Sequence, residues 1–158
     1  MDPIFLRRAL GRFTTGVTIV SCVDARGGYV GLTCNSFNAL SLEPPLVLWS
    51  LRDASQSLTA FEAAPRFSVN VLGEAQVDLS RRFASRHDDK FAEGAWALGE
   101  QGVPVLAGCA AVFECEKVSQ QQAGDHRLFI GRVLAAAESA VPPLLFRAGH
   151  YHLLGEVL

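Results

Sequence analysis

The stretch CAAVFECEKVSQQQAGDHRLFIGRVLAAAES, Cys109–Ser139, decides which kind of fold this chain adopts. It contains two long runs of strand-forming residues, Cys109–Gln122 and His126–Ser139, joined by Ala-Gly-Asp. Such a short connection joins neighbouring strands in antiparallel fashion, because a parallel pair needs a crossover of about a dozen residues or more. The stretch therefore predicts a long β-hairpin.

Shorter segments on both sides of this hairpin have the apolar runs or the alternation typical of strands. These segments are Gly16–Val23, Tyr29–Phe37, Pro45–Leu51, Arg66–Leu72 and Leu144–Leu154. Away from the start of the chain, helical spacing of apolar residues is confined to Asp53–Ala64 and Ala75–Ser85. Many strands with mostly short connections do not suggest βαβ units. We predict a mainly β fold, an antiparallel barrel with short inserted helices.

Length and composition support one compact domain. The chain has 158 residues, of which 49% are apolar and 19% charged, so an intrinsically disordered chain is excluded. With no linker, repeat or shift in composition, we predict a single domain over residues 1–158. The net charge of −2 gives no reason to expect a nucleic-acid partner, and no apolar stretch is long enough to span a membrane.

The start of the chain predicts a helix rather than a secretory signal, because its charged residues interrupt any continuous apolar run. Asp2-Pro3 is a good helix start, and Phe5, Ala9, Leu10 and Phe13 fall on one helical face. We expect this helix to pack on the domain and the protein to be cytoplasmic.

The four cysteines form no C-x-x-C motif, and we expect no disulfide in a cytoplasmic chain. Cys22, Cys109 and Cys115 are expected to be small core residues. Cys34 differs because it lies inside an unusually polar segment.

That polar segment is GLTCNSFNALSLEPPLV, Gly31–Val47, between two apolar runs. It carries small polar side chains where a core strand would have Val or Ile, and Pro44-Pro45 predicts a turn into the next strand. The polar residues are Thr33, Asn35, Ser36, Asn38 and Ser41. They indicate a strand edge that holds a ligand.

Three other places carry groups suited to a binding site. Ser55 and Ser57 precede a predicted helix and would suit a phosphate, although ordinary capping also explains them. Lys90 stands beside Phe91, either in the site or as a solvated charge. His126 follows the hairpin turn and is either part of the site or an exposed turn histidine.

Neither a catalytic nucleophile nor a matched pair of acids is evident. Gly11–Gly16 has the glycine spacing of a phosphate loop, but Val17 stands where that motif needs lysine. His150-x-His152 lacks further ligands at suitable spacing, so we expect no metal. The pattern therefore indicates a site where a bound cofactor does the chemistry: a flavin, pyridoxal phosphate or a nucleotide.

Several blocks in the right order resemble the flavin reductase domain family, the small reductase components of two-component flavin-dependent monooxygenases. They are the opening Phe5–Phe13, GLTCNSFNALSLEPPLVLWSL, SLTAFEAAPRFSVNVL, DKFA and GDHRLFIGRV. The resemblance covers Phe5 to Leu154. It implies an FMN-binding split barrel, a homodimer, hydride transfer from NADH or NADPH to FMN or FAD, and delivery of reduced flavin to a partner monooxygenase.

The resemblance also implies residue roles. His126 would stand beside the nicotinamide face of the flavin as the catalytic residue. The residues implied to bind the flavin are Thr33, Cys34, Asn35, Ser36, Ser50, Leu51, Ser55, Ser57, Lys90, Phe91 and Tyr151. Two alternatives stay open: a non-catalytic flavin-binding electron carrier, and an enzyme like pyridoxamine-phosphate oxidase.

Overall fold

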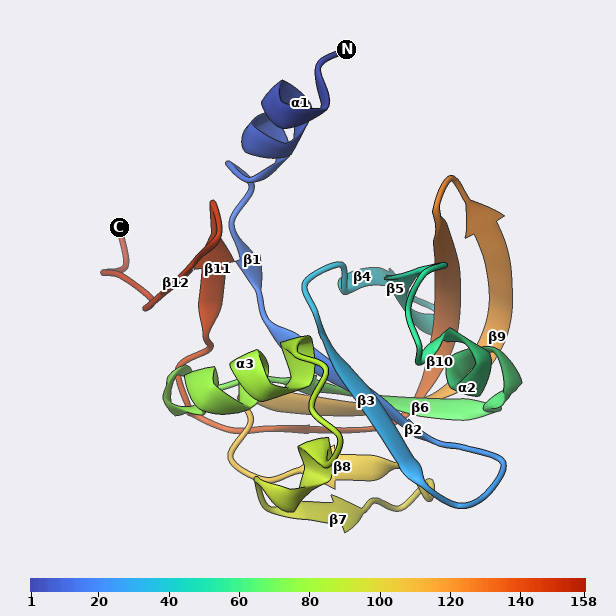
Figure 1. Cartoon of the computed structure of the whole chain (residues 1–158). Helices are drawn as coiled ribbons and strands as arrows, with labels where there is room; N and C mark the ends of the chain where they lie inside the picture. Colours follow the sequence, from blue (N-terminus) through green and yellow to red (C-terminus); the bar gives the residue numbers. More distant parts are fainter.

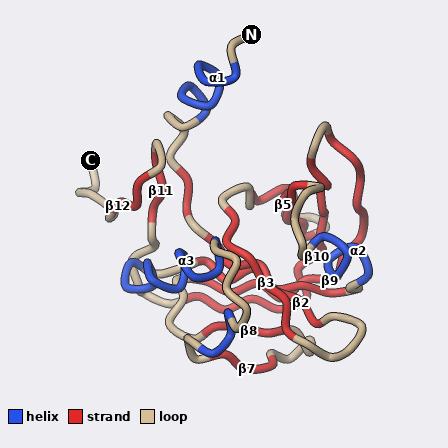
Figure 2. The backbone as a smooth tube through the Cα atoms, viewed as in Figure 1, coloured by secondary structure: helices blue, strands red, loops and turns tan.

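A seven-stranded antiparallel sheet forms the body of the protein in the computed structural model, which describes residues 1–158 (Figures 1 and 2). Its strand order is β3-β2-β6-β9-β10-β5-β4. The strands are β2 (Thr18–Val23), β3 (Tyr29–Cys34), β4 (Asn38–Leu42), β5 (Pro45–Arg52), β6 (Arg66–Val71), β9 (Ala111–Ala123) and β10 (His126–Glu138). The mainly β, antiparallel fold with short helices is confirmed.

The predicted long hairpin is β9–β10. Gly124, with φ of 62°, is the first residue of its two-residue turn, a position that favours glycine. The hairpin bends at two register shifts, one of them between Ile130 and Gly131. A Cβ on Gly131 would lie 2.4 Å from the Phe67 ring, so the bend requires glycine there.

Two apolar clusters fill the fold. The larger is built around Trp49, whose ring stacks on Phe129 at 4.7 Å between centroids and meets Phe61 edge-on at 4.9 Å. The smaller contains Phe83, Leu106 and other side chains beneath the helix that follows β6. Burial of these aromatic rings provides much of the driving force for folding.

A buried polar network attaches a small hairpin to the main sheet. Asn70 on β6 is fully buried and donates its side-chain amide to the carbonyl of Ile19, at 3.0 Å. Its side-chain oxygen accepts the backbone N–H of Leu106, at 2.9 Å. Leu106 belongs to the hairpin β7 (Trp96–Leu98) and β8 (Pro104–Leu106), which the sequence patterns did not predict.

The helices are short. They are α2 (Leu58–Ala63), η1 (Glu74–Gln76), α3 (Val77–Ala84) and η2 (Lys90–Ala92), none long and apolar enough to span a membrane. The helix predicted from Asp53 begins only at Leu58, because the preceding residues form turns in which Ser55 N–H bonds to Arg52. The predicted strand pair at the end of the chain is β11 (Leu145–Arg147) and β12 (His150–His152). On its other side β11 pairs with β1 (Thr15–Gly16), so the three strands form a second sheet.

The first helix, α1 (Pro3–Leu10), forms as predicted, with the Asp2 carboxylate accepting the N–H of Ile4 at 3.0 Å. Its expected packing on the domain is wrong. The helix stands away from the body (Figure 1), and none of its residues is buried. A short turn connects α1 to β1 at the edge of the small sheet, and the apolar face of the helix stays exposed in the single chain.

All four cysteines are buried and unpaired. Burial raises the pKa of Cys22, Cys109 and Cys115 to about 12, which keeps these thiols protonated and unreactive. Their predicted place in the core is confirmed.

Candidate functional site

One cavity of about 1190 Å³ lies between β3, the end of β5, the segment after β5, the segment between α3 and η2, and the beginning of β10. Its lining includes every predicted site residue except Tyr151: Thr33, Cys34, Asn35, Ser36, Ser50, Leu51, Ser55, Ser57, Lys90, Phe91 and His126. These residues are as much as 93 positions apart in the chain, from Thr33 to His126. The fold therefore brings the separate sequence blocks to one place.

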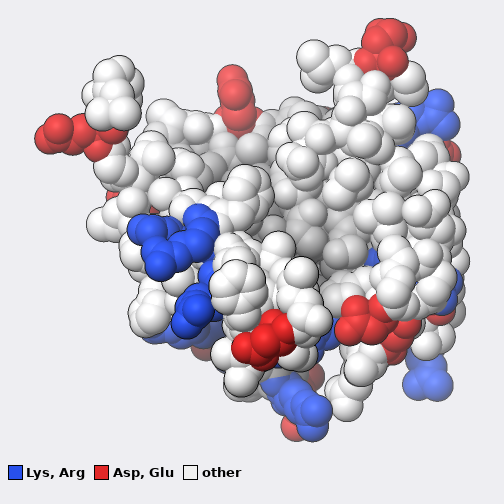
Figure 3. Space-filling model, turned by 90° about the horizontal axis from the view of Figure 1, so that it is seen from above, with Lys and Arg blue, Asp and Glu red and all other residues white.

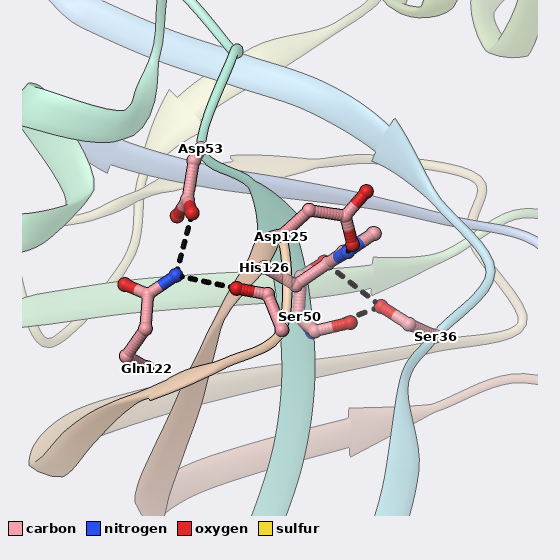
Figure 4. A network of polar contacts seen from close by, with 7 residues as sticks. Ser36, Ser50, Asp53, Gln122, Asp125 and His126 are labelled. Atoms are coloured by element: carbon pink, nitrogen blue, oxygen red, sulfur yellow. Dashed lines mark hydrogen bonds and ion pairs between the residues drawn. The ribbon is translucent and has the colours of Figure 1, made fainter.

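Ser36 connects two strands that share no backbone ladder. Its hydroxyl donates to the carbonyl of Ser50 at 3.0 Å and accepts the N–H of Ser50 at 2.9 Å (Figure 4). β3 is an edge strand of the sheet, and its extension reaches β5 through this side chain. Ser36 therefore shapes the cavity wall, and its hydroxyl is already occupied within the chain.

Ser36→Ala is expected to lower the free energy of unfolding by about 2 kcal/mol, because the half-buried N–H and carbonyl of Ser50 lose their partner. We also expect the KM for flavin to rise about fivefold, since the wall loses its fixed position. Thermal unfolding and steady-state kinetics measure both effects. Ser119→Ala, on the exposed part of β9, is the matched control; if Ser36→Ala behaves like it, this role of Ser36 is wrong.

The opposite wall is held by α3. The Thr33 hydroxyl donates to the carbonyl of Ser80 at 2.6 Å, and the Ser80 hydroxyl lies 2.8 Å from that of Tyr151. Tyr151 is outside the cavity, on β12, so the structure does not bring it to the site. Tyr151 supports the wall from behind, through Ser80 and by packing against the apolar cluster that contains Phe83.

Lys90 and Phe91 are in the wall, but the Lys90 ammonium bonds to the carbonyl of Phe83, at the end of α3, at 3.1 Å. Burial lowers the pKa of this ammonium. Arg82 braces the same segment by donating to the carbonyls of Asp89 and Lys90. The Phe91 ring packs edge-on against Phe83, with centroids 4.9 Å apart. This segment is thus a braced wall, and Lys90 contributes to its bracing.

His126 begins β10, where its backbone lies between Arg52 of β5 and Ala123 of β9. Its Nδ1 is 2.7 Å from the Asp125 carboxylate (Figure 4), and no partner within the chain binds its Nε2. The hydrogen bond to His126 is the main cause that holds the pKa of Asp125 below its ordinary value. The pair orients the imidazole at the cavity with one nitrogen free.

Several residues that line the cavity were not predicted as site residues, and three of them, Arg52, Gln56 and Arg86, have long polar side chains. All three are exposed, and no hydrogen bond within the chain occupies their side chains. The two guanidinium groups come from different walls and are free to bind anionic oxygens. Arg52 directly follows the predicted strand Pro45–Leu51, and this position at a strand end could have identified it as a site residue.

The cavity suits two polar ring systems with phosphate groups. Its volume exceeds the usual 300–1,000 Å³ of a single small-ligand site, and its wall is made mostly of small polar side chains and backbone. It contains free amide and hydroxyl groups at Asn35 and Ser50, two free arginines and the imidazole of His126. A reactive thiolate is absent from the core cysteines, and no group of three or more His, Cys, Asp or Glu could hold a metal ion.

Comparisons with known proteins agree with this site. The flavin reductase like domain matches residues 10–155. FMN reductase (NADH) SmoA of Agrobacterium fabrum is 43% identical over 145 residues, which cover 92% of this chain and 82% of that protein. A Rhizobium meliloti relative is 44% identical over 150 residues, and the chain spans only about half of it (48%).

A solved structure is also similar to this chain in fold. NADH:FAD oxidoreductase SgcE6 of Streptomyces globisporus C-1027, in complex with NAD and FAD fragments, superposes with a TM-score of 0.92 at 36% identity. The superposition covers 98% of this chain and 93% of that one. The match over residues 10–155 and the relatives above confirm the resemblance found in the sequence, and the chain belongs to the flavin reductase like domain family.

Proposed function

We propose that the protein is an NAD(P)H-dependent flavin reductase that supplies reduced flavin to a partner monooxygenase. The observation that carries this proposal is the cavity, which gathers His126, the polar end of β3 and the segment after β5 in one place. The names of the relatives support NADH as the donor and either FMN or FAD as the acceptor.

When bound together, the nicotinamide and the flavin supply the chemistry themselves, since a hydride passes from nicotinamide C4 to flavin N5. The protein has to bind and align the two rings and exclude competing arrangements. Backbone groups of Thr33 to Asn35, reachable between small side chains, would hold the polar edge of the flavin ring. Ser55, Ser57 and Arg52 would hold the ribityl and phosphate part.

His126 would contact the nicotinamide. The ring lines the cavity, its Nδ1 is bound by Asp125, and its Nε2 has no partner within the chain. With Nδ1 bonded to Asp125, Nε2 is available for a hydrogen bond with the carboxamide of nicotinamide. The role given to His126 is therefore orientation of the donor.

Two alternatives fit less well. An enzyme like pyridoxamine-phosphate oxidase would need a cluster of cations for its substrate phosphate, whereas the free cations Arg52 and Arg86 lie on separate walls. A carrier with permanently bound flavin would need a closed site, whereas this cavity is open to solvent. An open site suits a flavin that arrives and leaves.

Oxidation of NADH by the purified protein, followed with FMN, FAD or no added flavin, tests the proposal. We expect turnover that depends on added flavin. Absence of flavin-dependent oxidation with both NADH and NADPH would overturn the proposed function, and a yellow protein that is reduced once without turnover would support the carrier.

We also propose that the protein is a homodimer in which α1 packs on the second copy. Phe5 and Leu10 are 52% and 65% exposed, and Leu42 on β4 is 92% exposed. The centre of the face seen in Figure 3 is hollowed and uncharged, and clusters of Lys, Arg, Asp and Glu lie around it. Exposed large apolar side chains such as Phe5, Leu10 and Leu42 favour an interface with another protein. The cytoplasmic location expected from the sequence stays a prediction.

The mass of the protein in solution tests the dimer. We expect twice the 17.0 kDa of the chain. Phe5→Glu/Leu10→Glu is expected to yield monomers, because each buried carboxylate would be desolvated without a partner. Arg7→Glu, on the same helix but outside the apolar face, is the control. A parent protein that is monomeric at micromolar concentration would contradict the dimer.

A further inference from the structure

Gln122 links the hairpin turn beside His126 to the segment that follows β5. Its side-chain nitrogen donates to the carboxylate of Asp53 at 2.5 Å and to the carbonyl of Gly124 at 2.9 Å (Figure 4). Both N–H groups of the Gln122 amide are therefore used, one on the segment after β5 and one on the hairpin turn. A third bond, from Asp53 N–H to the carbonyl of Asp125 at 3.0 Å, closes the same connection.

Neither Gln122 nor Asp53 lines the cavity, yet each is next to segments that do. Asp53 precedes the lining residues Ala54–Ser57, and the Gly124-Asp125 turn precedes His126. The two partners are exposed, so their bond contributes little to the stability of the fold. This exposed hydrogen bond joins two walls of the site, and its donor amide is fixed by a second bond within the hairpin. Placement of those walls explains it better than stability does.

We infer that Gln122 and Asp53 are positioning residues for hydride transfer. They hold the hairpin turn, and with it the His126 imidazole, at a fixed distance from the wall formed by Ala54–Ser57, called here the flavin-side wall. The inference rests on the proposed function, because it concerns the role of His126. It goes beyond that role by assigning the alignment of the donor to two residues outside the cavity. A displacement of about 1 Å at a reacting centre is enough to slow a reaction about 100-fold.

Gln122→Met tests this inference, because methionine keeps the length of the side chain and removes both donors. We expect kcat with NADH at saturating FMN to fall about tenfold, because the donor is less well aligned, with the KM for FMN within about twofold of the parent. Gln120→Met is the matched control, since Gln120 is exposed on the same face of β9 and makes no side-chain hydrogen bond. Its kinetics should equal those of the parent.

Coupling between variants separates positioning from a general loss of structure. Gln122→Met is expected to have little effect in an Asp53→Ala background and almost none in a His126→Ala background, because the partner or the positioned ring is already missing. Asp53→Asn retains an oxygen acceptor and should retain near-parent kinetics. Additive effects of Gln122→Met in both backgrounds would overturn the inference.

A readout that does not depend on activity is hydrogen exchange of the Asp53 backbone amide. We expect exchange at least tenfold faster in Gln122→Met than in the parent or in Gln120→Met, with unfolding temperatures of all three within about 2 °C. Unchanged exchange would overturn the inference even if the parent proved inactive. A parent without flavin-dependent NADH oxidation overturns only the proposed function.

Discussion

His126→Ala is expected to lower kcat/KM for NADH about 100-fold at saturating flavin, with the KM for flavin within about twofold of the parent. The imidazole is held at the cavity by the 2.7 Å contact of its Nδ1 with Asp125 and by backbone pairing on both sides. Its removal leaves the flavin-side wall intact but takes away the group that aligns the donor. Steady-state kinetics with NADH varied at fixed flavin, and the converse, measure the two effects separately.

The control is His152→Ala, an exposed histidine on β12 outside the cavity. Its kinetics should match those of the parent. Equal rates of flavin reduction in His126→Ala and the parent would contradict the role given to His126. If the KM for flavin rises as much as the KM for NADH, the His126 imidazole binds the flavin rather than the nicotinamide.

Asn70→Ala is expected to lower the free energy of unfolding by about 3 kcal/mol. The change leaves the N–H of Leu106 and the carbonyl of Ile19 buried without this partner, and each such loss costs about 1–3 kcal/mol. At this chain length the midpoint of thermal unfolding should fall by about 6–12 °C. Differential scanning calorimetry measures both quantities.

The exposed Asn38 on edge strand β4 provides the comparison for this variant. Asn38→Ala should change the free energy of unfolding by less than about 0.5 kcal/mol. If Asn70→Ala is as stable as Asn38→Ala, the hairpin β7–β8 is not held by this network.

The strand pattern was predictable where local signals were strong. The β9–β10 hairpin was clear because alternating, strand-forming residues meet at a turn with glycine in the required position. β7 and β8 have three residues each, too few for any periodicity, and their attachment depends on the buried amide of Asn70, distant in the chain. Long-range side-chain bonds of this kind leave no local signature.

The site was predictable as a set of blocks but not in its internal contacts. The residue types at Ser36 and Lys90 indicated a binding site, whereas the structure uses the Ser36 hydroxyl to join β3 to β5 and the Lys90 ammonium to bind the end of α3. Gln122, in a run of three glutamines, offered no reason to be preferred over its neighbours. The packing of α1 was mispredicted because an apolar helix face indicates burial without identifying the surface that covers it.

Anaerobic mixing of the protein and flavin with NADH, followed by flavin absorbance, measures directly whether the protein reduces flavin. We expect loss of the oxidised-flavin absorbance, at a rate reduced by deuterium on the transferred position of nicotinamide C4, and reduced flavin recovered free of the protein. Unchanged flavin absorbance under these conditions, with the protein folded and the cavity residues intact, would contradict the proposed function.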